Sequence, residues 1–192
     1  LRPVAAVAGL VGVSLLCLSL YPLLGVAFFP RTDAGQFVIN LKAPSGTRVE
    51  LTEEYVKEVE EIIRQVVPNS DLQMVVSNIG ITADFSVIYT PNSAPHTAFV
   101  QASLREGHKV GSYEYMRRVR EQIQKKLPQL TAYFQSGGLV DAVLNLGLPA
   151  PIDIQVSGSD TDAAHAVASQ IASRTRQLSG VSDVLIPQDV DY

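Results

Sequence analysis

Side chains that could bind a metal ion or transfer a proton are few in this 192-residue sequence. Its three histidines are His96, His108 and His165. Two fall in predicted loops and one on a predicted helix, without the spacing of a metal-binding motif. A metal site and solvated polar side chains are both compatible with this pattern, and we expect solvated side chains.

Aspartates that could act in acid–base catalysis are equally scattered. Asp33, Asp84 and Asp141 lie in different predicted loops, so the sequence does not identify a carboxylate pair. The GxSxG, phosphate-binding-loop and HExxH motifs of common enzyme classes are absent from the sequence. The residues therefore predict neither an enzymatic activity nor a cofactor.

Composition argues against two other classes of protein. The chain has 15 Lys and Arg residues against 19 Asp and Glu, and no Trp, which argues against a nucleic-acid-binding surface. Cys17 is the only cysteine and lies in an apolar segment. A disulfide scaffold is therefore excluded, whereas a bacterial periplasm is compatible with the sequence.

The segment from Ser77 to His96 is the stretch most suited to binding a ligand. It is long for a connection between strands, and it carries several apolar side chains with a single charge, Asp84. Such a segment is typical of a loop that binds an apolar ligand, or of a hairpin that packs on a neighbouring domain. The residues favour neither alternative over the other.

The first element of the chain is an apolar helix. No charged residue occurs from Val4 to Phe29, and these 26 residues as a helix span roughly 39 Å, more than the roughly 30 Å hydrocarbon core of a bilayer. We predict a transmembrane helix, with a cleaved signal peptide and a buried soluble helix as alternatives. Arg2 favours an N-terminus inside the cytoplasm, with the residues from Arg31 onward outside it.

The next hundred residues alternate between strand and helix patterns. Period-two alternation predicts strands at residues 36–42, 72–76, 97–104 and 130–135. Helical spacing predicts one helix opened by a capping box at Thr47–Glu50 and ending at Val66, and a second over Tyr115–Leu127. The order strand–helix–strand–strand–helix–strand predicts an α+β, ferredoxin-like unit with both helices on one face of an antiparallel sheet.

After residue 150 the pattern begins again. A strand at 152–156, capping-box spacing at Ser159–Asp162, a helical stripe from Ala164 to Leu178 and a strand at 181–186 predict the first strand–helix–strand half of a second unit. Because such a half cannot bury its own faces, we interpret the chain as an excerpt of a longer protein. The predicted domains are a transmembrane helix (1–30), a ferredoxin-like unit (31–150) and an incomplete second unit (151–192).

Two motifs resemble RND (resistance–nodulation–division) efflux transporters. The family's Pro-x-x-Asp-x-Gly pattern and its later Pro-x-Gly turn match Pro30, Asp33, Gly35, Pro44 and Gly46. The segment Pro149–Gly158 resembles the start of the family's next porter subdomain. The resemblance covers essentially the whole chain, in the family's order.

The resemblance implies a fragment of an AcrB-like permease in the hydrophobe- and amphiphile-exporting branch. The helix from Val4 would be its seventh membrane helix, and the rest would begin its second periplasmic loop. Full-length members are homotrimeric, proton-driven multidrug antiporters of the bacterial inner membrane, which work with a periplasmic adaptor protein and an outer-membrane channel. Their proton-relay residues lie in other membrane helices. No Met cluster is present, so the metal-exporting branch is less expected.

The resemblance also implies substrate-binding residues. In the family, the loop after this unit's second strand is a mobile switch loop between substrate pockets. The residues at this place are Ile79, Gly80, Ile81 and Phe85. Phe99 and Phe134 lie on strands that flank the pocket in the family. The implied ligands are hydrophobic or amphiphilic small molecules.

Other functions are compatible with the residues alone. They are a single-span membrane sensor with an extracytoplasmic ligand-binding domain, a protein-export membrane subunit with porter-like domains, and an unrelated periplasmic enzyme. An RND transporter predicts about six apolar spans before this chain and five after the loop. A single-span sensor predicts a cytoplasmic signalling region before Leu1 and no further span.

Overall fold

The computed structural model describes residues 3–21, 32–80, 94–138, 143 and 150–186. The chain divides into two units, residues 1–31 and 32–192.

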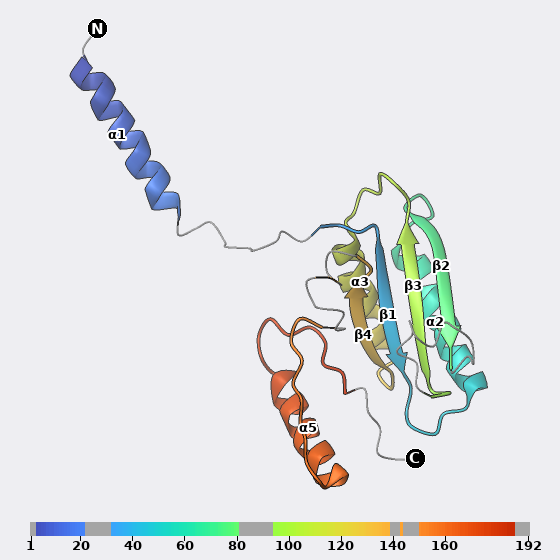
Figure 1. Cartoon of the computed structure of the whole chain (residues 1–192). Helices are drawn as coiled ribbons and strands as arrows, with labels where there is room; N and C mark the ends of the chain where they lie inside the picture. Colours follow the sequence, from blue (N-terminus) through green and yellow to red (C-terminus); the bar gives the residue numbers. More distant parts are fainter. Residues whose placement is uncertain (1–2, 22–31, 81–93, 139–142, 144–149, 187–192) are drawn as a thin grey trace. The chain divides into compact units, whose positions relative to one another are not determined.

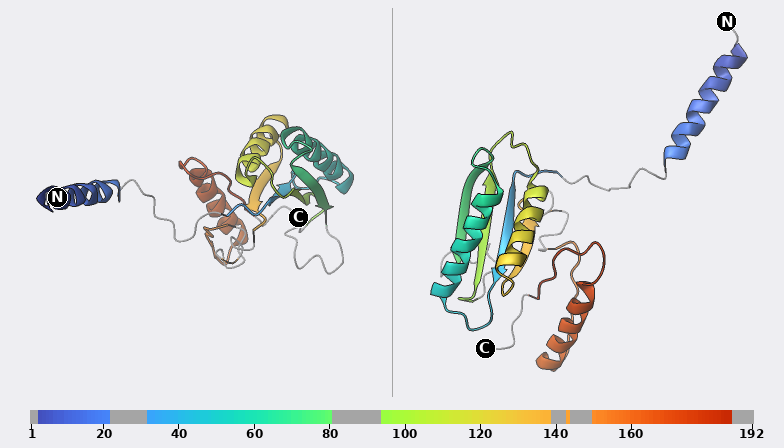
Figure 2. Two further views of the ribbon diagram at one scale, coloured as in Figure 1. Left: turned by 90° about the horizontal axis from the view of Figure 1, so that it is seen from above. Right: turned by 180° about the vertical axis from the view of Figure 1, so that it is seen from behind.

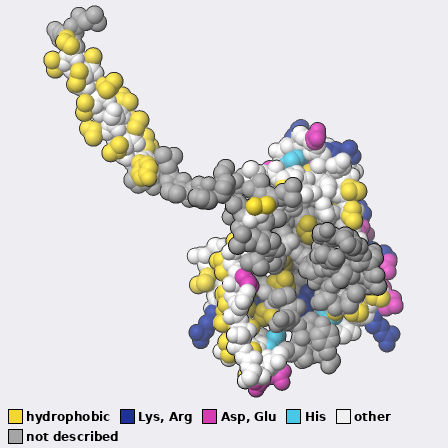
Figure 3. Space-filling view, viewed as in Figure 1, with side chains coloured by type: hydrophobic (Ala, Val, Ile, Leu, Met, Phe, Trp, Pro, Cys, Tyr) yellow, Lys and Arg dark blue, Asp and Glu magenta, His cyan; other side chains and the backbone are white. Residues whose placement is uncertain are grey.

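The first unit contains one helix, α1 (Pro3–Leu20), which Figure 3 shows covered by apolar side chains. Its large apolar residues are exposed, for example Val4 at 80% and Leu18 at 74%. Within the described residues, no helix has the length and apolarity needed to cross a membrane. The predicted span continues over residues 22–29, which lie outside the described residues.

The second unit contains a four-stranded antiparallel sheet with the spatial order β2-β3-β1-β4 (Figure 1). The strands are β1 (Gln36–Lys42), β2 (Leu72–Ile79), β3 (Thr97–Leu104) and β4 (Thr131–Ser136). Helix α2 (Val49–Val66) joins β1 to β2, helix α3 (Ser112–Lys126) joins β3 to β4, and both lie on the same face of the sheet (Figure 2). The predicted ferredoxin-like arrangement is confirmed, with a longer second strand.

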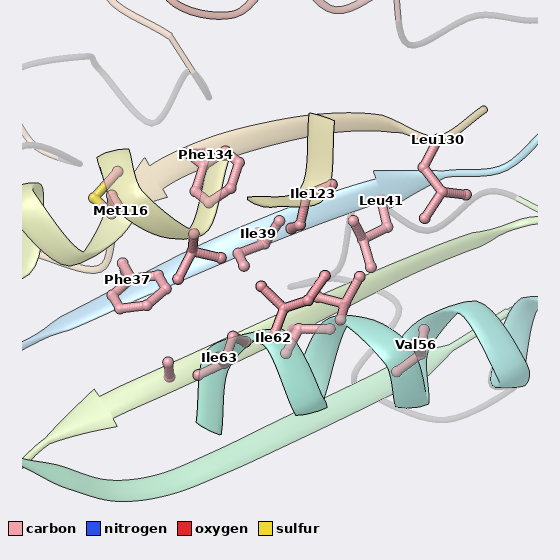
Figure 4. Packing of buried hydrophobic residues seen from close by; sticks show 14 of the residues in the cluster. Phe37, Ile39, Leu41, Val56, Ile62, Ile63, Met116, Ile123, Leu130 and Phe134 are labelled. Carbon is pink, nitrogen blue, oxygen red and sulfur yellow. The ribbon is translucent and has the colours of Figure 1, made fainter. Parts of the chain in front are cut away.

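The core lies between this sheet and its two helices. Phe37, Ile39 and Leu41 alternate along β1 toward the helices and are at most 5% exposed. Figure 4 shows them packed with Ile63 of α2 and Ile123 of α3. Because full burial of such a side chain contributes roughly 1.5–3 kcal/mol, this cluster is the main source of the unit's stability.

The start of α2 differs from the predicted capping box. Thr47 Oγ1 donates to the Pro44 carbonyl oxygen at 2.6 Å, and Arg48 is the N-cap residue without a side-chain cap. The hydroxyl group therefore closes the preceding turn instead of capping the helix. Gly46, in that turn, has a φ of +83°, a conformation that favours glycine.

Residues after 150 form one helix, α5 (Thr161–Thr175), as predicted. Its cap is Asp160, one residue after the predicted Ser159, and the Asp160 side chain accepts a hydrogen bond from the Ala163 N–H at 3.0 Å. A carboxylate suits this position because it also interacts favourably with the helix dipole.

The strands predicted on either side of α5 are wrong. Residues 152–156 and 181–186 pair with no strand among the described residues. A strand is stabilised by its ladder with a partner strand and by burial of one face, and here Ile152 is 75% exposed. The hydrophobic alternation is therefore present without the sheet that it predicts.

Candidate functional site

The face of the sheet opposite α2 and α3, which we call the open face, has two central rows of side chains. Strand register aligns Asn78, Phe99, Asn40 and Tyr133 in one row across the four strands. It aligns Val76, Gln101, Val38 and Gln135 in the next row. Neither row contains a charged residue.

The open face combines apolar surface with a few polar groups. Val76 is 43% exposed near the β2 edge, and Met74 on the same strand is 54% exposed. Toward β4 the side chains of this face are more buried, since Asn40 is 9% and Tyr133 8% exposed. Apolar and aromatic side chains with a small number of polar atoms are typical of sites for small organic molecules.

The amide groups of this face differ in their hydrogen bonding. Gln101 Nε2 donates to Gln36 Oε1 at 3.0 Å, and Gln36 Nε2 donates to the Gly137 carbonyl oxygen. Asn40 Oδ1, in contrast, is buried and has no hydrogen-bond partner among the described residues. An acceptor is thus left unsatisfied near the middle of the face.

Two of the predicted switch-loop residues lie where β2 ends. Ile79 is the last residue of β2 and packs against the core. Gly80 follows with a φ of +70°, and its N–H donates to the Thr97 carbonyl oxygen at 2.8 Å. A side chain at Gly80 would be strained because of this φ. Ile81 and Phe85 lie outside the described residues.

The two predicted phenylalanines lie on opposite faces of the sheet. Phe99 is half-buried on the open face, opposite Asn78 and so next to the end of β2. Phe134 lies on the helix side, 6% exposed, with the Arg120 guanidinium 4.5 Å from its ring centroid. The structure therefore brings Phe99 close to the β2 end and places Phe134 in the core.

A charged cluster that the sequence analysis missed fixes the start of α3. Asp33 Oδ2 accepts hydrogen bonds from the Ser112 N–H at 2.9 Å and from His108 Nε2 at 3.1 Å. His108 Nδ1 lies 2.9 Å from the Arg105 carbonyl oxygen. Both ring nitrogens thus face groups that only accept, so this arrangement fits the doubly protonated imidazolium.

The pKa values in this cluster follow from these contacts. The pKa of His108 is raised, first by its hydrogen bond to Asp33 and then by that to Arg105. Burial opposes ionisation of Asp33, but hydrogen bonds from Ser112, Gly35 and His108 outweigh it and hold the Asp33 pKa well below its usual range. Asp33 and His108 are 75 positions apart in the sequence, so no local sequence signal indicates this pair.

A buried pair, Tyr115 and Asp71, also contacts the segment between β3 and α3. Tyr115 Oη donates to Asp71 Oδ2 at 2.7 Å, and the Lys109 N–H donates to the same oxygen at 3.2 Å. Burial and this hydrogen bond raise the pKa of Tyr115 to about 12, and the Tyr115 and Ser70 hydroxyls lower that of Asp71. These pairs fix the backbone between β3 and α3.

Two of the three histidines differ from the expected solvated side chains. His96, which directly precedes β3, is 4% exposed, and its carbonyl oxygen accepts a hydrogen bond from the Ala43 N–H at 2.9 Å. His108 is engaged as described above. No group of three His, Cys, Asp or Glu side chains in the described part of the chain could hold a metal ion.

A largely buried ion pair joins the segment after α5 to helix α3. Arg120 donates from Nε and Nη2 to the two carboxylate oxygens of Asp183 at 2.8 and 2.9 Å. Asp183 Oδ2 also accepts from the Phe134 N–H at 3.1 Å, and Lys42 Nζ donates to the Ile186 carbonyl oxygen at 3.3 Å. Asp183 therefore satisfies a backbone N–H of the edge strand β4.

Comparison with known structures shows that the fold is shared with solved proteins. Two crystal structures described as a heavy metal efflux pump, crystal forms I and II, match 96% of this chain with TM-scores of 0.71 and 0.70 at 22% identity. The chain spans 19% of the length of each. At this identity the match concerns the fold alone. No curated protein sequence matches the chain.

A family model gives the more specific result. The AcrB/AcrD/AcrF family model matches residues 2–191, nearly the entire chain. That extent agrees with the order of motifs from Pro30 to Gly158. The chain belongs to the AcrB/AcrD/AcrF family of RND efflux transporters.

Proposed function

We propose that the chain is part of a proton-driven multidrug exporter, and that hydrophobic or amphiphilic small molecules contact the open face as they pass outward. The observation that carries the proposal is the pair of charge-free rows on that face, in a family of efflux transporters. A broad surface of aromatic, aliphatic and amide groups suits loose specificity. Coupling to protons would use residues outside this chain.

The proposed location is the bacterial inner membrane. Residues 1–30 would form a membrane helix, and residues 31–150 and 151–192 would be porter subdomains in the periplasm. The support is the absence of charge from Val4 to Phe29 together with the apolar side chains that cover α1, since a helix apolar on all sides needs an apolar environment. Family membership supports a homotrimer with an adaptor protein and an outer-membrane channel as partners.

The proposed substrate-contacting residues are grouped around the end of β2. Ile79, Gly80 and Phe99 lie there, and Ile81 and Phe85 follow directly in the sequence. Gly80, with its positive φ, would let the chain turn sharply away from β2. Phe134 would act from the opposite face, by supporting the sheet beneath the pocket.

Accumulation of a fluorescent lipophilic dye tests the proposed function. Efflux-deficient cells would express the full-length parent gene with its adaptor, with and without a protonophore. We expect lower accumulation than in cells without the gene, and we expect the protonophore to abolish the difference. Equal accumulation, with the protein present in the membrane and the adaptor bound, would contradict the proposal.

Efflux of a metal ion is the second candidate function. It is favoured by the two matched crystal structures, which are described as a heavy metal efflux pump. Growth of the same cells in graded concentrations of zinc, copper(I) and silver salts separates the candidates. Metal tolerance without dye export would replace the first proposal by the second.

A further inference from the structure

Asn40 has a buried, unused hydrogen-bond acceptor on the open face, between Phe99 of β3 and Tyr133 of β4. The residue is 9% exposed, and its Oδ1 atom has no partner within the described part of the chain. Burial of an amide oxygen without a partner costs free energy that an apolar side chain of similar size would not cost. The packing of the sheet alone therefore gives no reason for an asparagine at this position.

The other unsatisfied buried atom in the described residues is of a different kind. Ser112 Oγ belongs to a residue that is 0% exposed and lies on the buried side of α3. Asn40, in contrast, alternates with Ile39 and Leu41, which face the helices, so it belongs to the opposite face of the sheet. Only the Asn40 acceptor lies on the face proposed to meet substrate.

Aromatic side chains flank this acceptor. Phe99 of β3 and Tyr133 of β4 lie directly opposite Asn40 in register, a relation in which Cβ atoms are about 4.5–5.5 Å apart. Aromatic ring faces attract cations, most strongly where water is excluded. The nearby cation on β1, Lys42, donates its Nζ to the Ile186 carbonyl oxygen.

We propose that Asn40 is a specificity-determining residue that selects amphiphiles carrying an N–H donor, above all a protonated amine. The amide oxygen would accept a hydrogen bond from the N–H of the ligand. The rings of Phe99 and Tyr133 would contact the charged group and pack against the adjoining carbon atoms. The inference rests on the proposed function, because it assigns a substrate class to the same face. It predicts discrimination between ligands of equal charge that differ only in the donor.

A matched pair of dyes provides the test. One fluorescent lipophilic dye carries a tertiary ammonium group, with one N–H, and the other is its quaternary N-methyl analogue, with none. Binding of each dye to the purified full-length parent protein would be measured by fluorescence polarisation for wild type, Asn40→Leu and Asn40→Asp. The control is Gln101→Leu, which removes an amide of the same face whose partner, Gln36, lies within the chain.

The expected result is a loss of discrimination in one variant. Wild type should bind the tertiary dye about tenfold more tightly than the quaternary dye, the order expected of one hydrogen bond to a charged donor. Asn40→Leu should lower the affinity for the tertiary dye to that for the quaternary dye. Asn40→Asp keeps an acceptor, so it should preserve the preference for the tertiary dye, and Gln101→Leu should preserve it as well. Each variant would first be checked for the wild-type elution profile.

Three outcomes overturn the inference, and they are distinguishable. If Asn40→Leu changes the affinity for both dyes equally, or for neither, Asn40 does not distinguish ligands by their N–H donor, although the proposed function stands. If Asn40→Asp abolishes tertiary binding while Asn40→Leu does not, the amide N–H rather than its oxygen meets the ligand. If neither dye binds to wild type, the proposed function fails and the inference with it.

Discussion

The sheet unit (residues 32–136) and the tail segment (residues 150–186) carry similar sequence patterns and have different structures. Helix α2 of the sheet unit buries Thr52, Val56, Val59, Ile62 and Ile63, whereas α5 of the tail segment buries only Ala172. The alternating residues of β1 are paired on both sides, and those at 152–156 are unpaired among the described residues. A helix forms from local contacts, but a strand needs its partners, so the same pattern gives a closed unit in one case and a lone helix in the other.

The largest predicted difference between the two regions is in the cost of removing an apolar side chain. Phe37→Ala should destabilise the chain by roughly 3–5 kcal/mol, since Phe37 is 0% exposed in the core. Ile152→Ala, at a residue that is 75% exposed, should change stability by no more than about 0.5 kcal/mol. Denaturant unfolding of the full chain in detergent measures both. Similar costs would mean that the tail segment is packed as a core.

The next prediction concerns the ion pair that joins the two regions. Asp183→Ala leaves the Arg120 guanidinium, whose side chain is 18% exposed, without its partner, and should cost about 2 kcal/mol. The exposed pair Lys57–Glu53 is the matched control, and Glu53→Ala should cost less than about 1 kcal/mol. Hydrogen exchange should show faster exchange in residues 181–186 of the Asp183 variant. An unchanged exchange rate there would show that the contact does not hold the segment.

The third prediction tests whether α5 is stabilised locally. Asp160→Ala removes the cap of this helix and should cost it about 1 kcal/mol, seen as faster amide exchange in its first turns. Ser159→Ala, at the residue that the sequence pattern predicted as the cap, should have a smaller effect. Exchange in α2 should be unaltered in both variants. If Ser159→Ala had the larger effect, the assigned cap would be wrong.

The smallest predicted effect is the pH dependence of the sheet unit. The raised pKa of His108 means that its stabilising contribution is complete below its ordinary value of 6.5 and is lost as pH rises through the raised value. The lowered pKa of Asp33 means that its contribution is complete above 3.8 and is lost only as pH falls through the lowered value. Stability should therefore decline as pH rises above 6.5.

His108→Gln is the variant that checks this pH dependence. The variant should be slightly less stable than wild type at pH 6, and the decline above 6.5 should be weaker. Amide exchange near Ser112, whose N–H donates to Asp33, is the local measurement. A decline of equal size in the variant would assign the pH dependence to other groups.

The sequence predicted the sheet unit better than the site. Alternation located Gln36–Lys42 and Thr97–Leu104 with the observed bounds, because half-buried strands show period two directly. The caps were misplaced, since the Thr47 and Ser159 hydroxyls fit a capping box that backbone geometry did not use. Which residue caps a helix depends on the backbone geometry of the turn that precedes it.

The site was predictable only in part, because its geometry depends on pairing across the sheet. Phe99 and Phe134 are equivalent in sequence terms, and the registers of β3 and β4 place them on opposite faces. The sequence pattern does not distinguish Asn40 as a site residue, because polar residues are normal on one face of an alternating strand. Only the folded sheet shows that Asn40 Oδ1 is buried without a hydrogen-bond partner and that Phe99 and Tyr133 lie opposite Asn40 in register.

Photolabelling is the most direct test of the claim that the open face binds the transported molecule. The full-length parent protein would be labelled with a diazirine derivative of a transported lipophilic dye, and the labelled residues would be located by mass spectrometry. We predict labelling of β3 at Phe99 and of neighbouring open-face residues, and suppression of this labelling by excess unmodified dye. Labelling confined to the outer surfaces of α2 and α3, or labelling of Phe99 that excess dye does not suppress, would contradict it.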